Sequence, residues 1–131
     1  MQKRRFHPPG ALSLRMVAMQ TDSNVAGEMS REWVLYSMDL AAVVAAGALA
    51  KGRVATAAVS NLKFLQPVKI GDVVCFYTVV TKTGRTSITV AVEAHALRCN
   101  LAERIRATAA EFVVVAVDDE GLPRPLPVVA L

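Results

Sequence analysis

The amino-acid sequence predicts an α+β domain in which one long central helix is wrapped by a curved antiparallel sheet of about five strands. The first observation is a nearly unbroken apolar stretch from Trp33 to Ala50, too long for a strand and apolar on every side of a helix. The second is a series of β-branched runs on both sides of this stretch, separated by short turn sequences. A helix without a polar face must be covered by other elements, and a curved sheet provides that cover.

Composition limits the class of protein. The 131 residues fit a single domain, here residues 1–131, and 53% hydrophobic with 20% charged residues excludes a disordered chain. The net charge is +4, but the sequence has no dense run of basic residues with aromatic residues between them. We therefore expect no nucleic-acid partner. Two cysteines are too few for a disulfide scaffold. Cys75 and Cys99 are therefore expected to be reduced, buried strand residues of a cytoplasmic protein.

Two segments resemble targeting or membrane signals. The basic start has the composition of a transit peptide, but Pro8 and Pro9 break any amphipathic helix there, so residues 1–11 are expected to form a flexible N-terminus. The apolar stretch spans eighteen residues, short of the ~20 needed to cross a bilayer, and it contains Asp39. A lone carboxylate in lipid is costly, so we expect a soluble protein and no membrane partner.

The elements follow in a simple order. Leu12 to Val17 is a short apolar run that predicts the first strand, and a polar, turn-like stretch follows to Gly27. Ser30 is the candidate N-cap of the helix, and Lys51-Gly52 is a typical helix end.

The C-terminal part predicts the remaining strands, and Thr83-Gly84-Arg85 is a hairpin-type connection between two of them. A turn at 118–121 and an extended, proline-rich tail over residues 121–131 complete the chain. The helix would still need a partner subunit to cover its remaining surface, which predicts a homodimer. The four predicted strands are Arg53 to Phe64, Asp72 to Lys82, Thr86 to Arg98 and Arg104 to Val117.

Asp39 is the first candidate for chemistry, because only Ser37 otherwise interrupts the apolar helix with a polar side chain. One interpretation is a structural carboxylate satisfied by backbone amides. The other is a general base or a nucleophile at a buried cleft.

Other polar residues give weaker signals. Asn24 in the loop before the helix is typical of a turn, and Gly27 is an ordinary turn glycine, although free amides at a helix start can receive an oxyanion. The turn Gly84-Arg85-Thr86-Ser87 offers one cation and two hydroxyls to a phosphate. His7 and His95 have no partners at metal-ligand or triad spacing and are expected on the surface, so we expect no metal site.

Nine ordered segments resemble the short bacterial acyl-CoA thioesterases of the hotdog fold, the YciA-like branch. They extend over most of the chain, and their order and spacing are together specific. The segments are Leu14–Met19, Thr21–Gly27, Trp33–Asp39, Gly52–Val54, Phe64–Val68, Gly71–Cys75, Lys82–Ile88, Val115–Asp118 and Gly121–Pro127.

The resemblance implies acyl-CoA hydrolysis at a site shared by two protomers. Asn24 from one protomer would face Asp39 from the other, and Asp39 would activate water or attack the thioester carbonyl. The CoA phosphates would lie near Gly84, Arg85, Thr86 and Ser87. The resemblance further implies no cofactor and a hexamer built as a trimer of dimers. The other substrate-binding positions would be Gly27, Ser30, Arg31 and Asn61.

The sequence departs from the family pattern around this site. Ser30, Arg31 and Glu32 replace an aromatic residue or His followed by two glycines, and Ala26 replaces a second Asn. Ser60-Asn61 stands where Glu-Ser is usual. Two alternatives therefore remain beside the hydrolase: a weak or silent acyl-CoA-binding protein, and a thioesterase acting on acyl groups held by a carrier protein.

Overall fold

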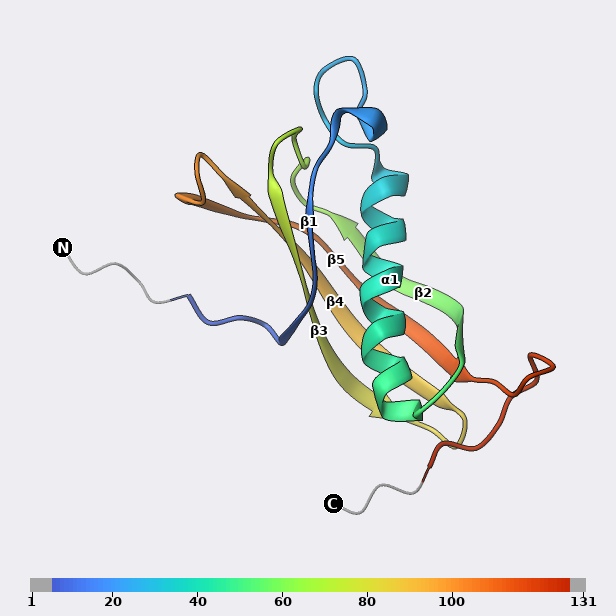
Figure 1. The fold of residues 1–131 in the computed structure, drawn as a ribbon. Coiled ribbons are helices and arrows are strands. Elements are labelled where there is room, and N and C mark those ends of the chain that lie inside the picture. Colours follow the sequence, from blue (N-terminus) through green and yellow to red (C-terminus); the bar gives the residue numbers. More distant parts are fainter. Residues whose placement is uncertain (1–5, 128–131) are drawn as a thin grey trace.

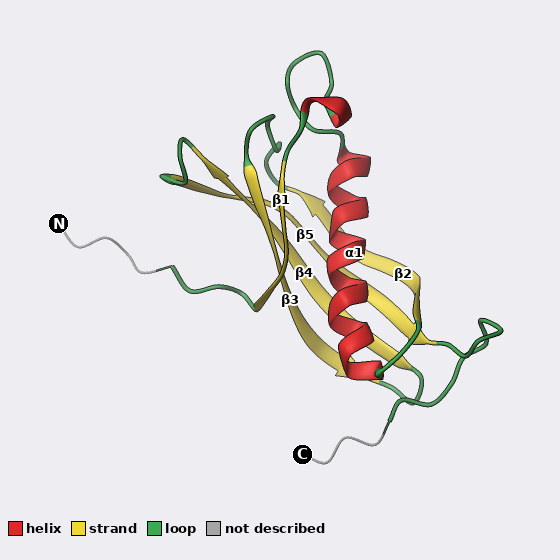
Figure 2. Cartoon of the chain, viewed as in Figure 1, coloured by secondary structure: helices red, strands yellow, loops and turns green. Residues whose placement is uncertain are grey.

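The computed structural model describes residues 6–127, which form one long helix and a five-stranded sheet. Figures 1 and 2 show the helix lying across one face of the sheet. Every predicted element is confirmed, with ends displaced by at most one residue. The elements are β1 (Ala11–Val17), a 3₁₀ turn (Gln20–Asp22), α1 (Arg31–Ala50), β2 (Val54–Phe64), β3 (Val73–Thr83), β4 (Ser87–Arg98) and β5 (Glu103–Ala116).

The sheet is antiparallel throughout and has the order β1-β3-β4-β5-β2. The three C-terminal strands form a meander, and the two N-terminal strands pair with its outer edges. The sheet bends around α1 (Figure 1), and register shifts in all four strand pairs accompany this bend. The core lies between α1 and the concave face of the sheet. Alanines on α1, including Ala41, Ala42 and Ala46, allow close packing against larger side chains such as Phe76 and Phe112.

The sheet covers only part of the helix. Tyr36, Leu40 and Val44 lie one turn apart along α1 and are 63%, 37% and 55% exposed. Beyond the first turn of α1, the exposed positions form this single strip, and the rest of the helix is at least partly buried. By length and composition α1, with mean hydropathy 1.7, could also cross a membrane. The central helix of a soluble domain passes the same test, and here α1 contacts all five strands.

Both helix ends are defined by side chains. Ser30 is the N-cap, and its hydroxyl accepts a hydrogen bond from the Trp33 amide at 3.1 Å. Lys51 ends the helix in the left-handed conformation. Arg124, from the C-terminal tail, donates to the carbonyls of Ala50 and Val117 at 3.1 and 3.0 Å. The tail is therefore attached to the end of the helix through Arg124, and the predicted tail residues 128–131 lie outside the described residues.

A buried ion pair fixes the turn before β3. Asp72 is 2% exposed, and its carboxylate receives two hydrogen bonds from Arg98 of β4 at 2.9 and 2.8 Å. It also accepts from the Lys69 amide at 2.9 Å, and the Arg98 guanidinium reaches the Pro67 carbonyl. The Asp72 carboxylate raises the pKa of Arg98. This network attaches residues 67–72 to the sheet.

Two sequence expectations are wrong. His95 is buried rather than on the surface, because Phe6 and Tyr77 pack against its ring at centroid distances of 5.6 and 5.2 Å. Burial lowers the pKa of His95, although a hydrogen bond to Glu93 opposes this effect. Cys99 is an exposed turn residue with φ 53°, not a buried strand residue, whereas Cys75 is buried in β3 as expected. Residues 1–5 of the predicted flexible segment 1–11 lie outside the described residues.

Candidate active site

Asp39 lies in the middle of α1 and points toward β2. Its Oδ1 atom accepts a hydrogen bond of 2.5 Å from the Thr56 hydroxyl, and the Asp39 side chain is only partly buried. A carboxylate held in one orientation by a single hydroxyl retains free lone pairs on its other oxygen. Asp39 can therefore accept a proton or attack an electrophile.

Asn24 organises the loop that precedes the helix. Its Oδ1 atom accepts hydrogen bonds from the Ala26 and Glu28 amides at 2.9 and 3.0 Å, and its backbone amide donates to the Glu28 carbonyl. Gly27 occupies the left-handed region with φ 78°. Asn24 is thus the turn-forming residue that its loop sequence indicates. These bonds use the side-chain oxygen, so a contact with substrate would come from the Nδ2 amide.

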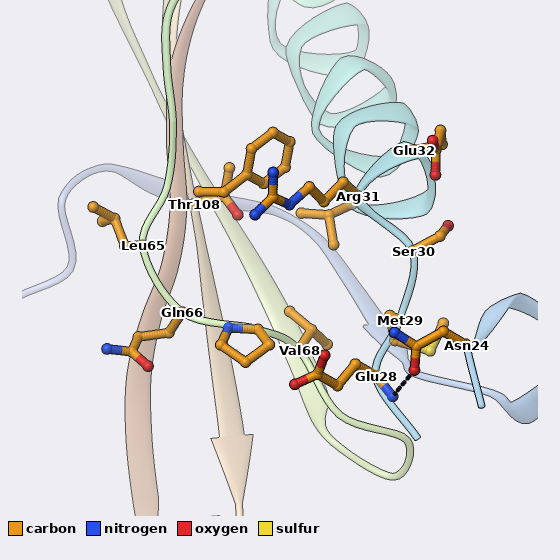
Figure 3. Close-up of a pocket in the computed structure, with 13 residues that line it drawn as sticks. Asn24, Glu28, Met29, Ser30, Arg31, Glu32, Leu65, Gln66, Val68 and Thr108 are labelled. Carbon is orange, nitrogen blue, oxygen red and sulfur yellow. Dashed lines mark hydrogen bonds between the residues drawn. The ribbon is translucent and has the colours of Figure 1, made fainter. Parts of the chain in front are cut away.

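A cleft of about 510 Å³ separates the start of α1 from the segment after β2. Figure 3 shows Asn24 and Ser30 on one side of the cleft and Leu65 and Gln66 on the other. Arg31 extends from the start of α1 toward Thr108 (Figure 3). Thirteen residues line the cleft: Asn24, Glu28, Met29, Ser30, Arg31, Glu32, Val34, Phe64, Leu65, Gln66, Pro67, Val68 and Thr108.

The turn at Gly84-Arg85-Thr86-Ser87 lies at a different end of the sheet, where β3 joins β4 (Figure 1). The register pairs Val114 with both Thr56 and Ile88. Thr56 of β2 and Ile88 of β4, just after the turn, therefore lie opposite each other on either side of β5. The spacing between strands puts them about 10 Å apart across the sheet. The C-terminal tail holds it in place, because the Leu126 amide donates to the Arg85 carbonyl at 2.8 Å.

Asn61 lies apart from both regions. It occupies an irregular part of β2, with φ 52°, where the register with β5 shifts between Ser60 and Lys63. Its side-chain amide donates to Glu111 at 3.0 Å, and it does not line the cleft.

One chain brings only some of the predicted site residues together. Asn24, Ser30 and Arg31 line one cleft, with Gly27 in the adjoining loop. Asp39 is not among the residues that line it, and Thr56 is a neighbour of Asp39 that the sequence did not single out. Within residues 6–127, no three His, Cys, Asp or Glu side chains are grouped to hold a metal ion.

Comparison with known proteins gives consistent matches. Residues 33–103 match the model of the thioesterase superfamily. The chain is 42% identical to the acyl-CoA thioester hydrolase YciA of Salmonella typhimurium, over 92% of this chain and 93% of that protein. The hexameric thioesterase y2039 from Yersinia pestis superposes with a TM-score of 0.89 at 43% identity, covering 94% of this chain and 100% of that one.

A more distant relative was solved as two single-residue variants. An acyl-CoA hydrolase from Staphylococcus aureus superposes with a TM-score of 0.78 at 25% identity, over 87% of this chain and 70% of that one. It was solved as one Asp→Ala and one Thr→Ala variant, and the two positions are 17 residues apart, as Asp39 and Thr56 are here.

The helix lying on a curved antiparallel sheet is the hotdog fold, as the sequence predicted. The family match covers more than half of the chain, and the YciA match covers nearly all of it. The chain therefore belongs to the thioesterase superfamily, among relatives named acyl-CoA thioester hydrolases.

Proposed function

We propose that this chain is an acyl-CoA thioester hydrolase that uses the Asp39 carboxylate to cleave the thioester bond with water. The products are free CoA and a carboxylic acid. The observation that carries the proposal is the orientation of Asp39 by Thr56 on the central helix, in a chain closely related to YciA. Hydrolysis needs only water and a base or nucleophile, so the reaction requires no cofactor.

The active site would form between two protomers. Asp39 and Asn24 belong to different parts of one chain, and a facing protomer would bring its own Asn24 loop to Asp39. The exposed apolar residues of α1 and the unpaired edge of β2 offer the surface for such a contact. The hexameric state named for the Yersinia pestis relative is consistent with a trimer of such dimers, with two sites in each dimer. We place this assembly in the cytoplasm.

Two routes lead to the same products. As a general base, Asp39 takes a proton from water while the water oxygen attacks the carbonyl carbon. The C–S bond then breaks, and the CoA thiolate takes up the proton. As a nucleophile, Asp39 forms a mixed anhydride and expels the thiolate, and water then hydrolyses the anhydride. In both routes the backbone amides at the start of α1 would stabilise the oxyanion, and Asn24 would orient the carbonyl or the water.

The CoA portion would bind at the turn between β3 and β4. Arg85 supplies a guanidinium for phosphate, and the hydroxyls of Thr86 and Ser87 supply hydrogen bonds. Because this turn lies near the level of Thr56 on the sheet, CoA bound there would direct its thioester toward Asp39 of the same protomer.

The function is tested by measuring free thiol released from acyl-CoAs of short to long chain length with a thiol-reactive dye. Hydrolysis supports the proposal and gives the chain-length preference. A folded protein that binds CoA but releases no thiol from any ester would instead be a silent acyl-CoA-binding protein. A protein that hydrolyses acyl groups on a carrier protein, but not on CoA, would also contradict the proposal.

Thr56→Val should lower kcat about tenfold. It removes the hydrogen bond that the neutral Thr56 hydroxyl donates to the charged Asp39 carboxylate, and losing such a bond costs about 1.5 kcal/mol or more. The substitution keeps the shape of the side chain but frees the Asp39 carboxylate to rotate. Thr56→Ser is the matched control, since it retains the hydroxyl and should keep most of the activity. Steady-state thiol release measures both variants. Equal losses in the two variants would mean that packing, not the hydrogen bond, matters at this position.

A further inference from the structure

We propose that the cleft beside α1 selects acyl groups that end in a carboxylate, and that Arg31 binds this carboxylate. The preferred substrates would then be CoA monothioesters of dicarboxylic acids. This inference rests on the proposed hydrolase function and names the substrate class of the same site. It starts from the one cationic side chain among the residues that line the cleft.

Arg31 lines the cleft as an exposed side chain that, among the described residues, forms no ion pair with an acidic residue. Its guanidinium lies over the Phe64 ring, 4.9 Å from the ring centre, and Figure 3 shows it extending toward Thr108. Within residues 6–127, the ion pairs involve Arg98, Arg106 and His95, and none involves Arg31. A guanidinium that stacks through its face leaves the N–H groups along its edge free. Those groups match the two oxygens of a carboxylate.

The remaining cleft surface fits the methylene chain of such a substrate. Met29 and Val34 on one side, with Leu65 and Pro67 on the other, provide apolar walls. Glu28 and Glu32 also line the cleft, but neither forms an ion pair with Arg31, and Figure 3 shows the Glu28 carboxylate beside Val68. Glu28 would therefore repel an anionic chain end and Arg31 would attract it. This difference in charge would orient the acyl chain with its terminal carboxylate at Arg31.

The position of the cleft agrees with the path of the substrate. CoA on the turn at 84–87 would place the thioester at Asp39 of one protomer. The facing protomer would contribute its Asn24 loop and the adjoining cleft to the acyl group. An apolar chain end in this cleft would displace water from Arg31 and leave the guanidinium without a partner, which is unfavourable. A terminal carboxylate supplies the missing partner.

The test compares two esters of equal carbon number, adipoyl-CoA and hexanoyl-CoA, which differ only in the terminal carboxylate. The wild-type protein should show a higher kcat/KM for adipoyl-CoA. Arg31→Ala should lower the ratio of adipoyl to hexanoyl kcat/KM about tenfold, the loss expected for one hydrogen-bonded charged pair. Arg31→Lys keeps the charge and should retain part of the preference.

Arg85→Ala is the matched control, because it removes a cation from the surface proposed for the shared CoA portion. It should raise KM for both esters by the same factor and leave their ratio as in the wild type. If Arg31→Ala also changed both esters equally, Arg31 would contact the CoA portion, and the proposal would be wrong. A wild-type preference for hexanoyl-CoA would equally overturn it.

Failure of the hydrolase function is distinguishable from failure of this inference. If neither ester is cleaved, calorimetric titration of both esters into the wild-type protein and Arg31→Ala gives the same comparison from binding. Tighter binding of adipoyl-CoA that disappears in Arg31→Ala would support the carboxylate site in a silent protein. Equal affinities for the two esters would contradict it.

Discussion

Asp39→Ala should lower kcat for acyl-CoA hydrolysis by about 10²- to 10⁴-fold, the contribution typical of a general base, and by more if Asp39 is a nucleophile. The reason is chemical: without the carboxylate, the variant has no group at this position to deprotonate water or attack the thioester carbonyl. Thiol release under saturating substrate measures the effect. A variant that kept activity close to the wild-type level would remove Asp39 from the mechanism.

Asp39→Asn is the matched control, since it keeps the size of the side chain and an oxygen that can accept from Thr56. If charge is what matters, Asn should be nearly as inactive as Ala. Both variants should retain the fold and the assembly, because Asp39 is partly exposed and lies outside the hydrophobic core. Circular dichroism and size-exclusion chromatography check this. Loss of the oligomer in either variant would show that Asp39 also supports the interface.

Asp72→Ala should reduce the free energy of unfolding by about 3 kcal/mol, the lower end of the range for breaking a buried ion pair. The lower end is expected because the Arg98 side chain is 22% exposed and can recover some hydration. The Lys69 amide would lose its acceptor, and the turn before β3 would lose its ion pair with Arg98 of β4. Urea denaturation at one fixed protein concentration measures the change, since assembly makes stability depend on concentration.

Arg106→Ala is the comparison for this prediction. Arg106 pairs with Glu93 at 2.6 Å, but its side chain is 53% exposed. An exposed pair contributes about 1 kcal/mol or less, so this variant should be nearly as stable as the wild type. Similar losses from Asp72→Ala and Arg106→Ala would mean that burial does not determine the strength of these pairs in this fold.

The apolar stretch, the β-branched runs and the turns between them predicted one long helix and an antiparallel sheet, and the family resemblance predicted the hotdog fold. Strict alternation from Ile88 to Ala96 indicates a strand with one buried face, and those residues are buried against α1. His95 shows the limit of this reasoning. Alternation tells which face of the sheet a side chain occupies, but not what covers that face. Phe6, far away in the sequence, lies against His95 on the side opposite the helix.

Only part of the candidate site could be predicted, because a residue stands out in a sequence only when its type is unusual for its surroundings. Asp39 stands out because a carboxylate in an apolar helix is unusual, and Asn24 because of its loop sequence. Thr56 gives no such signal, since threonine is common in strands. Its role depends on where α1 rests against β2, and only the three-dimensional structure shows this contact. The sequence also cannot show that the cleft and Asp39 lie in separate parts of one chain.

The strand order has a consequence for how the chain is made. β1 pairs only with β3, and β2 pairs only with β5, so the N-terminal half contains no strand that can pair within that half. During synthesis, α1 emerges early and must wait for residue 116 before its cover is complete. The most apolar segment thus remains incompletely covered on the ribosome until β5 has been made, and uncovered apolar surface promotes aggregation. Chains that end before β5 should accumulate as insoluble protein or remain bound to chaperones.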